Sequence, residues 1–172
     1  MNYTIENPKG IDKQIQTIQT ALFDNIGWNN INVFGRVHRN QSKEKGLVPE
    51  FYVGKNEYKD VFINDKINAT ICFIDDENHK ALTGGLFDTE VKIVFCVNLN
   101  KIKNSISHRA DMEVEIDAIK IINKHKILSV TGFEKGVEAV FKGFNVDHIK
   151  LSDMQPFHVF AIVGRLKYKI NC

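Results

Sequence analysis

The sequence predicts an α+β domain in which an antiparallel or mixed sheet packs against two main helices. Two amphipathic helix patterns lie near the start and in the middle of the chain, and strand patterns occupy residues 31–39, 69–74, 90–99 and 157–168. Because these helices and strands are grouped and do not alternate regularly, a doubly wound parallel sheet is disfavoured. No repeat or low-complexity linker divides the 172 residues, so we expect one domain over residues 1–172.

The first element is expected to be a helix from Ile11 to Ile26. Apolar side chains recur on one side of this segment every three or four residues, at Ile11, Ile15, Ile18, Leu22 and Ile26. Gly27 follows, and glycine readily adopts the left-handed conformation that ends many helices. This segment is therefore the first of the two helices expected to cover the sheet.

Strands and polar connections are expected to alternate over the next sixty residues. A strand is predicted from Ile31 to Arg39, and the polar residues 40–47 after it are expected to form an exposed loop. Pro49 begins an extended segment, and Ala69 to Ile74 form the next predicted strand. Residues 75–86 are mostly polar and contain two adjacent glycines, so they are expected to form a second exposed loop.

The middle of the chain combines the clearest strand alternation, from Glu90 to Leu99, with a second helix. Ser107 is the expected N-cap of this helix, and the helix is expected to end near Lys126, where cations favour the C-terminal dipole. A short helix is expected within residues 135–142. The buried stripe of the second main helix is predicted to consist of Met112, Ile116, Ile119 and Ile122.

The last strand is expected to begin after Pro156, which fixes its own backbone and disfavours a helix before it. One face of this strand carries His158, Phe160, Ile162, Gly164, Leu166 and Tyr168. The other face carries Val159, Ala161, Val163, Arg165 and Lys167, so it changes from apolar to charged halfway along. We therefore expect the strand to be buried on both faces at its start and to project beyond the core at its end.

Composition excludes several classes of function. With 23 basic and 21 acidic residues, the net charge of +2 is too balanced for nucleic-acid binding by the whole surface. Cys72 and Cys96 lie in apolar strands and are interpreted as buried hydrophobic side chains, and with Cys172 they fit a reducing compartment. The sequence has no pattern of a signal peptide or a membrane-spanning segment, so we expect no membrane association.

No residue pattern indicates a catalytic centre, a metal site or a cofactor. The acidic run from Asp75 to Glu77, with His79 close behind it, lacks the spacing of a calcium loop and is interpreted as a solvated turn. His158 lies on the apolar face of the last strand and is interpreted as a buried histidine that is hydrogen-bonded to a neighbour. One concentrated basic segment, Arg36 to Lys45, is either a solvated loop or a contact for a polyanion.

The order of these elements resembles the head-to-tail connector and tail-terminator proteins of tailed bacteriophages, which are small α+β subunits. The resemblance lies in the helix 11–26, the strand 90–99, the following helix beginning Arg109-Ala110-Asp111-Met112, and the closing segment from Asp153 to Tyr168. Further similarity to connector proteins of phages infecting Bacteroidetes lies in Pro49, Tyr52, Gly54 and the Glu57-Tyr58 pair before Asn64-Asp65.

The resemblance implies a tail-terminator-like fold and a non-enzymatic virion protein assembled in the host cytoplasm. The subunit would form a closed ring of about six or twelve copies that joins the portal side to the tail around the DNA channel. Its partners would be neighbouring neck, portal or tail proteins, with non-specific contact to packaged DNA. The residues expected to contact DNA or an adjacent ring are Arg36, Arg39, Lys43 and Lys45, and those expected to form the strand contact between subunits are Arg165, Lys167 and Tyr168.

Two other functions stay open on the sequence alone. The chain fits a small cytoplasmic binding module, for example an antitoxin or anti-defence protein, that docks a partner through an exposed strand. It also fits a ferredoxin-like enzyme whose site is assembled from distant residues such as Asp75, His79 and His108. Converging ionisable groups in a deep pocket would favour the enzyme over the ring subunit.

Overall fold

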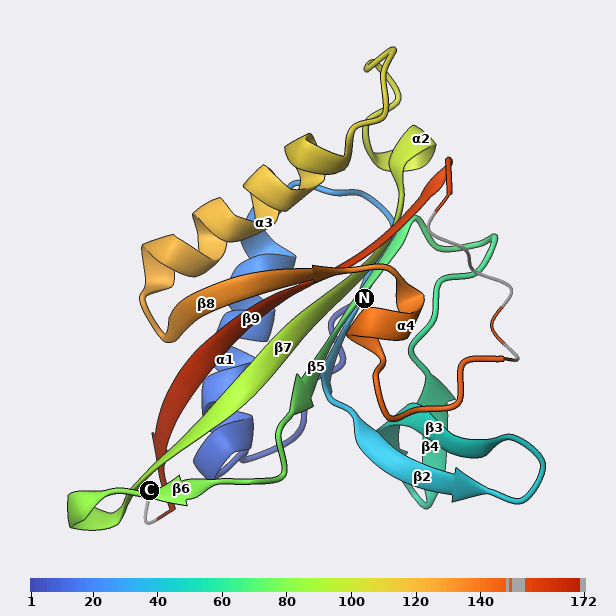
Figure 1. The fold of residues 1–172 in the computed structure, drawn as a ribbon. Coiled ribbons are helices and arrows are strands. Elements are labelled where there is room, and N and C mark those ends of the chain that lie inside the picture. The colour runs from blue at the N-terminus through green and yellow to red at the C-terminus, as the bar shows by residue number, and fades with distance from the viewer. Residues whose placement is uncertain (148, 150–153, 171–172) are drawn as a thin grey trace.

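The computed structural model describes residues 1–147, 149 and 154–170, and it confirms the α+β fold class. A large mixed sheet of six strands forms the centre of the molecule, and a second, antiparallel sheet of three strands lies beside one end of it (Figure 1). The large sheet has the strand order β1-β5-β7-β9-β8, with β6 paired to β7. Among the strand pairs that the structure describes in this sheet, only β1–β5 is parallel, which makes the sheet mixed.

The strands of the large sheet are β1 (Ile31–Arg36), β5 (Ala69–Asp75), β6 (Lys80–Ala81), β7 (Leu86–Asn98), β8 (Leu128–Lys135) and β9 (Phe157–Lys169). The small sheet contains β2 (His38–Ser42), β3 (Gly46–Gly54) and β4 (Glu57–Asp60). The helices are α1 (Gly10–Asn25), α2 (Leu99–Ile102), α3 (Asp111–His125) and α4 (Val137–Val140), and a 3-10 turn, η1, spans Thr83–Gly85.

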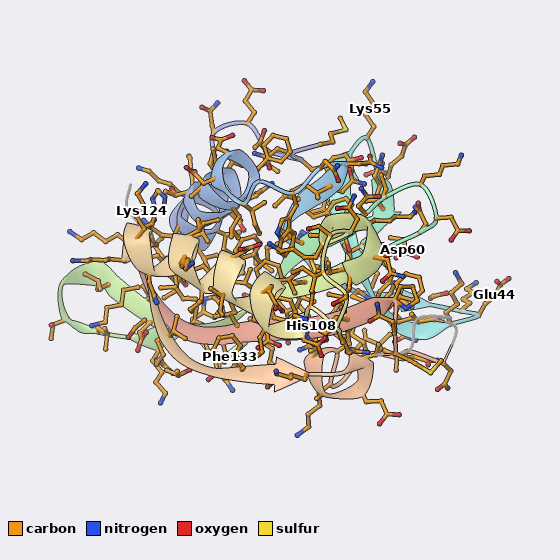
Figure 2. The ribbon with its side chains drawn as sticks, turned by 90° about the horizontal axis from the view of Figure 1, so that it is seen from above. Glu44, Lys55, Asp60, His108, Lys124 and Phe133 are labelled. Carbon is orange, nitrogen blue, oxygen red and sulfur yellow. The ribbon has the colours of Figure 1, made fainter. Side chains whose placement is uncertain are left out.

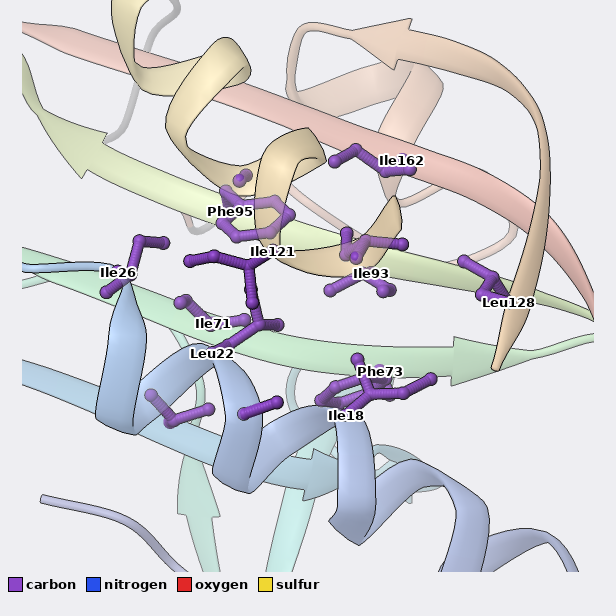
Figure 3. Close-up of a cluster of buried hydrophobic side chains, with 14 of the residues drawn as sticks. Ile18, Leu22, Ile26, Ile71, Phe73, Ile93, Phe95, Ile121, Leu128 and Ile162 are labelled. Carbon is purple, nitrogen blue, oxygen red and sulfur yellow. The ribbon is translucent and has the colours of Figure 1, made fainter. Parts of the chain in front are cut away.

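The main core lies between the large sheet and the two long helices. Alternate residues of the central strands point to this side, including Ile71 of β5 and Ile93 of β7, and they meet Leu22 of α1 and Ile121 of α3 (Figure 3). The predicted stripe of α1 is confirmed, because all five of its apolar residues from Ile11 to Ile26 are buried. Helix α1 also contacts α3, so the two helices form one layer on this face of the sheet.

A second core covers part of the opposite face. Phe34 and Phe51 pack there with Phe141, which follows α4, and with both Cys72 and Cys96. The small sheet and α4 therefore cover one end of this face, and the buried positions of the two cysteines are as predicted. Beyond this second core the strands β7 and β9 carry charged side chains such as Lys92 and Arg165 on the same face.

The closing strand is confirmed in position, but its end does not project beyond the core as expected, because Leu166 and Tyr168 still belong to the main core. β9 pairs with β7 along its whole length and with β8 from Phe160 to Leu166. Its first residues are buried on both faces, whereas Lys167 and Lys169 near its end are exposed. Asp153, at which the segment resembling connector proteins begins, lies outside the described residues.

Two predicted connections are wrong in part. The predicted strand 31–39 divides at Val37 into β1 and β2, which belong to different sheets, and residues 40–47 form most of a β2–β3 hairpin instead of a loop. The sequence does not predict β2 because His-Arg-Asn-Gln-Ser contains no apolar residue. A strand at the edge of a small exposed sheet can be entirely polar. Of residues 75–86, which were expected to form an exposed loop, Asp75 is instead the buried last residue of β5 and Leu86 begins β7. Residues 76–85 contain β6 and η1 and are mostly exposed as expected.

The prediction for the second helix has the right place and half of the right face, because Ile122 is buried and Ile119 packs against the core. Ala110, not Ser107, precedes the first turn of α3 as its N-cap. The buried side of α3 carries Val114, Glu115, Ala118, Ile121 and Ile122. Met112 and Ile116, which were expected in the core, are 57% and 40% exposed.

Candidate functional site

A chain of polar side chains ties together four elements at one end of the large sheet. Arg36, the last residue of β1, donates to both carboxylate oxygens of Asp12 in α1, at 2.8 and 3.1 Å. Its Nη1 also lies 3.6 Å from Oδ2 of Asp75, and the same oxygen is 3.0 Å from Nε2 of His79. The other ring nitrogen of His79 is hydrogen-bonded to the hydroxyl of Tyr168 in β9.

Burial and neighbouring groups shift the pKa of two members of this network, Arg36 and Tyr168, and of His38 beside it. The hydrogen bond with Asp12 is the main cause that raises the pKa of Arg36, although burial opposes it. Burial, followed by the negative charge of Asp75, raises the pKa of Tyr168, so its hydroxyl stays protonated. Burial and the nearby Arg36 charge lower the pKa of His38, the next ionisable residue along the chain. The polar groups of this network are hydrogen-bonded or ion-paired to one another, so the network serves to hold α1, β1, β5 and β9 together.

A small cavity of about 120 Å³ lies beside this network, and its lining includes Tyr3, Asp12, Arg36, His38 and Phe51. Sites that enclose small-molecule ligands usually measure roughly 300–1,000 Å³, so this cavity is smaller than such a site.

Of the three residues considered for an assembled enzyme site, Asp75 and His79 are in contact. His108 lies instead near the start of α3, where it is 2.7 Å from Glu113, and the structure does not bring it to the other two.

The predicted role of His158 as a buried, hydrogen-bonded histidine is confirmed. Its side chain is 1% exposed, and its Nε2 lies 3.0 Å from Oε1 of Glu115 in α3. Lys135 at the end of β8 places its Nζ 2.7 Å from the same oxygen. Glu115 therefore joins α3 to β8 and β9 as a buried carboxylate with two partners, which the apolar pattern of the helix did not predict.

The basic segment is largely neutralised within the subunit. Arg36 is bound by two carboxylates, and Arg39 lies 3.3 Å from Glu77 and stacks over the ring of Phe144. Lys43 and Lys45, at the turn of the β2–β3 hairpin, are exposed and form no ion pair with any described residue. Contact with DNA or an adjacent ring thus stays a prediction that rests on these two lysines.

Of the three residues predicted to form a strand contact between subunits, Arg165 and Tyr168 have partners inside the subunit, and Lys167 is exposed. Arg165 donates to Oδ2 of Asp88 at 2.7 and 2.9 Å. Tyr168 is 7% exposed and stacks on Phe87, so its side chain packs inside the subunit. Lys167 is exposed, and it lies just beyond Leu166, where the pairing of β9 with β8 stops.

The two edges of the large sheet differ. The outer edge of β1 is covered by the N-terminal residues, because Tyr3 donates to the carbonyl of Val33 and Val33 donates to the carbonyl of Met1. Gln19 of α1 holds this segment by donating to Asn2, Tyr3 and Val33. β8, at the other edge, has no strand on its outer side among the described residues, although a bulge between Val130 and Gly132 interrupts it.

Three large apolar side chains are exposed beside β8, and we call them the apolar strip: Met112, Ile116 and Phe133. Met112 and Ile116 are one turn apart on α3. Phe133 is 44% exposed and pairs across the sheet with Ile162, whose side chain is in the helix-side core, so Phe133 points to the same face as α3. Figure 2 shows Phe133 at β8, below α3. The apolar periodicity of the sequence predicts Met112 and Ile116 in the core, but both are exposed.

The two buried thiols are expected to be inert in the folded protein. Burial raises the pKa of Cys96 to about 12 and also raises that of Cys72, so both stay protonated at neutral pH. Treatment of the native protein with iodoacetamide should leave both unmodified, whereas treatment in denaturant should modify both. Peptide mass mapping distinguishes the two results, and labelling of Cys96 under native conditions would contradict the second core described above.

Comparison with protein-family models, with curated proteins and with solved structures finds no match. Within residues 1–147, 149 and 154–170, no group of three or more His, Cys, Asp or Glu side chains is placed to hold a metal ion. None of the described helices has the length and apolar character needed to cross a membrane.

Proposed function

We propose that this protein is a structural subunit that assembles with copies of itself into a closed ring in the neck of a tailed bacteriophage. The ring would join the portal side to the tail around the DNA channel, and would contain about six or twelve copies. The observation that carries the proposal is the open β8 edge together with the exposed apolar strip beside it. The sequence resemblance to connector and tail-terminator proteins supports the place in the virion.

The apolar strip is unusual for a surface that faces only water. Single exposed apolar residues are common, but three large ones beside an unpaired strand form a surface that favours contact with another protein. A closed ring requires each subunit to present two different complementary surfaces. Ile5 and Phe23 offer a second one, because they are 40% and 36% exposed on the β1 side of the molecule. Phe23 follows Gln19 by one turn of α1, on the side that holds the N-terminal residues.

A binding module that docks a different protein through β8 is the second candidate. The same open strand favours it, since an extended segment of a partner can add to a free sheet edge. The two candidates differ in what occupies the edge: another copy in the ring, or an unrelated chain in the module. The mass of the purified protein therefore separates them.

Charged substitutions in the apolar strip are expected to abolish assembly without unfolding the subunit. In the double variant Ile116→Glu/Phe133→Glu, each new carboxylate stays hydrated in the monomer but would be buried, unpaired, in a contact between copies. Native mass spectrometry should show a ring for the unaltered protein and a monomer for the variant. Circular dichroism at a concentration too low for assembly should give the same thermal midpoint for both, within about 2–4 °C.

The matched control is Leu82→Glu, which changes an apolar side chain of similar exposure, 43%, in the segment between β6 and η1. This variant should assemble like the unaltered protein. If the unaltered protein stays monomeric at every concentration tested, the ring proposal is wrong. Assembly that survives the double variant would instead show that the strip is not the contact.

A further inference from the structure

Exposed lysines gather at one end of the large sheet, and we call this surface the basic end: Lys13, Lys126, Lys167 and Lys169. Lys13 belongs to the first turn of α1, Lys126 follows α3, and the other two end β9. The start of α1, the end of α3 and the end of β9 lie on the same side of the molecule (Figure 1). None of the four lysines forms an ion pair with a described residue, in contrast to Arg36 and Arg39.

Three shallow depressions connect these lysines into one surface. The first, of about 440 Å³, lies between α1 and His125 and includes Lys13. The second, of about 340 Å³, includes Lys13 again together with Lys167 and Lys169. The third, of about 730 Å³, includes Lys167, Lys126 and Arg165. Because neighbouring depressions share Lys13 or Lys167, the positive charges follow one continuous path.

Few negative charges offset the basic end. Among the described residues that line the three depressions, the carboxylates are Asp24 and Asp88, and Asp88 is already held by Arg165. Because Asp88 is paired with Arg165, the four lysines are offset by one carboxylate, that of Asp24. The net positive charge of this surface is therefore larger than the +2 of the whole chain. The balanced composition therefore conceals a local patch that can attract a polyanion.

We propose that the basic end binds the phosphate backbone of double-stranded DNA without reading its sequence. Separate lysine ammonium groups are suited to phosphate contacts, which position a protein on DNA but carry no base specificity. An anionic membrane is a weaker fit, since surfaces that lie on lipid combine basic residues with a broad apolar face. The inference rests on the proposed function for the source of its partner, the DNA that passes through the neck.

The test is a triple variant that removes charge without adding acid: Lys13→Gln/Lys126→Asn/Lys169→Gln. Asparagine is chosen at position 126 because Lys126 has a φ of 53°, which asparagine tolerates. Binding to a fluorescein-labelled duplex of mixed sequence is followed by anisotropy from about 50 to about 200 mM salt. The variant should bind at least about tenfold more weakly, and its slope of log affinity against log salt should be shallower by about 2 to 3.

The matched control is Lys55→Asn/Lys66→Gln/Lys142→Gln. It removes the same charge from three exposed lysines, one of which, Lys55, also has a φ of 53°. Figure 2 shows Lys55 pointing into solvent on the side of the molecule opposite Lys124, near the end of α3. The control should bind DNA like the unaltered protein. An equal loss in both variants, no binding of DNA by the unaltered protein, or binding confined to vesicles of anionic lipid would each overturn the assignment.

The outcome is separable from that of the ring proposal. Native mass spectra of the same samples report assembly independently of DNA binding, and the triple variant keeps the apolar strip intact. A monomer that binds DNA through the basic end would refute the ring and keep this inference. A ring that does not bind DNA would refute this inference and leave the ring proposal intact.

Discussion

Replacing Phe160 by aspartate is expected to abolish folding. Phe160 is fully buried in the middle of β9, and its ring stacks on Phe95 with centroids 4.7 Å apart and on His158 at 5.1 Å. The substitution removes that packing and places a carboxylate among apolar side chains, a loss of more than about 5 kcal/mol. Since a whole domain is stable by about 5–15 kcal/mol, little or no folded protein should remain.

The control for this prediction is Phe160→Leu, which keeps an apolar side chain in the same place. It should lower the free energy of unfolding by only about 1–2 kcal/mol and retain a cooperative transition. Chemical denaturation followed by circular dichroism measures both variants. A cooperative transition for Phe160→Asp close to that of the unaltered protein would show that this part of β9 does not lie in the core.

The second large effect is expected at Gly164, where β8 and β9 approach closely. A Cβ atom at this position would lie 2.6 Å from Cγ of Leu128 and 2.8 Å from the carbonyl oxygen of Ser129. Gly164→Ala should therefore lower the free energy of unfolding by about 1–3 kcal/mol, and the bulkier Gly164→Val by more. Hydrogen exchange of the β8 amides should accelerate more than exchange in β5.

A double-mutant cycle identifies the cause of this effect. Leu128→Ala creates space beside position 164 and costs about 2–5 kcal/mol by itself, because Leu128 is 5% exposed. If the clash with Leu128 is the main cause, Gly164→Ala/Leu128→Ala should be less destabilised than the sum of the two single variants by at least about 0.5 kcal/mol. Simple additivity would instead assign the loss to the backbone of Ser129.

The helices and central strands could be predicted because burial there follows one simple period. In α1 the apolar residues from Ile11 to Ile26 leave a single choice of buried face, and in β9 the alternation around Phe160 is equally clear. In α3 two stripes compete, one through Met112 and Ile116 and the other through Val114 and Ala118. The second stripe is buried although it includes Glu115, because His158 and Lys135 satisfy that carboxylate. Such partners lie far away in the sequence.

The candidate surfaces were harder to predict for the same reason. The sequence shows that Arg36, Arg39, Lys43 and Lys45 are basic, but their acidic partners come from other parts of the chain. Lys13, Lys126 and Lys167 are separated by up to 154 positions and become neighbours only through the packing of α1, α3 and β9. β8 was missed because a bulge and Gly132 break its alternation.

The closure of β1 by Met1 to Tyr3 limits how far the large sheet can grow. Two copies that joined at β8 about a two-fold axis would use both free edges of that sheet, so no third copy could add to it by backbone pairing. Fibres that form by backbone pairing between the large sheets of successive copies are therefore prevented. In the proposed ring the large sheets therefore stay separate, and side chains must make the contact, with the apolar strip beside β8 of one copy against the flank of the next copy that carries Ile5 and Phe23. The number of copies is then set by the angle between these two flanks.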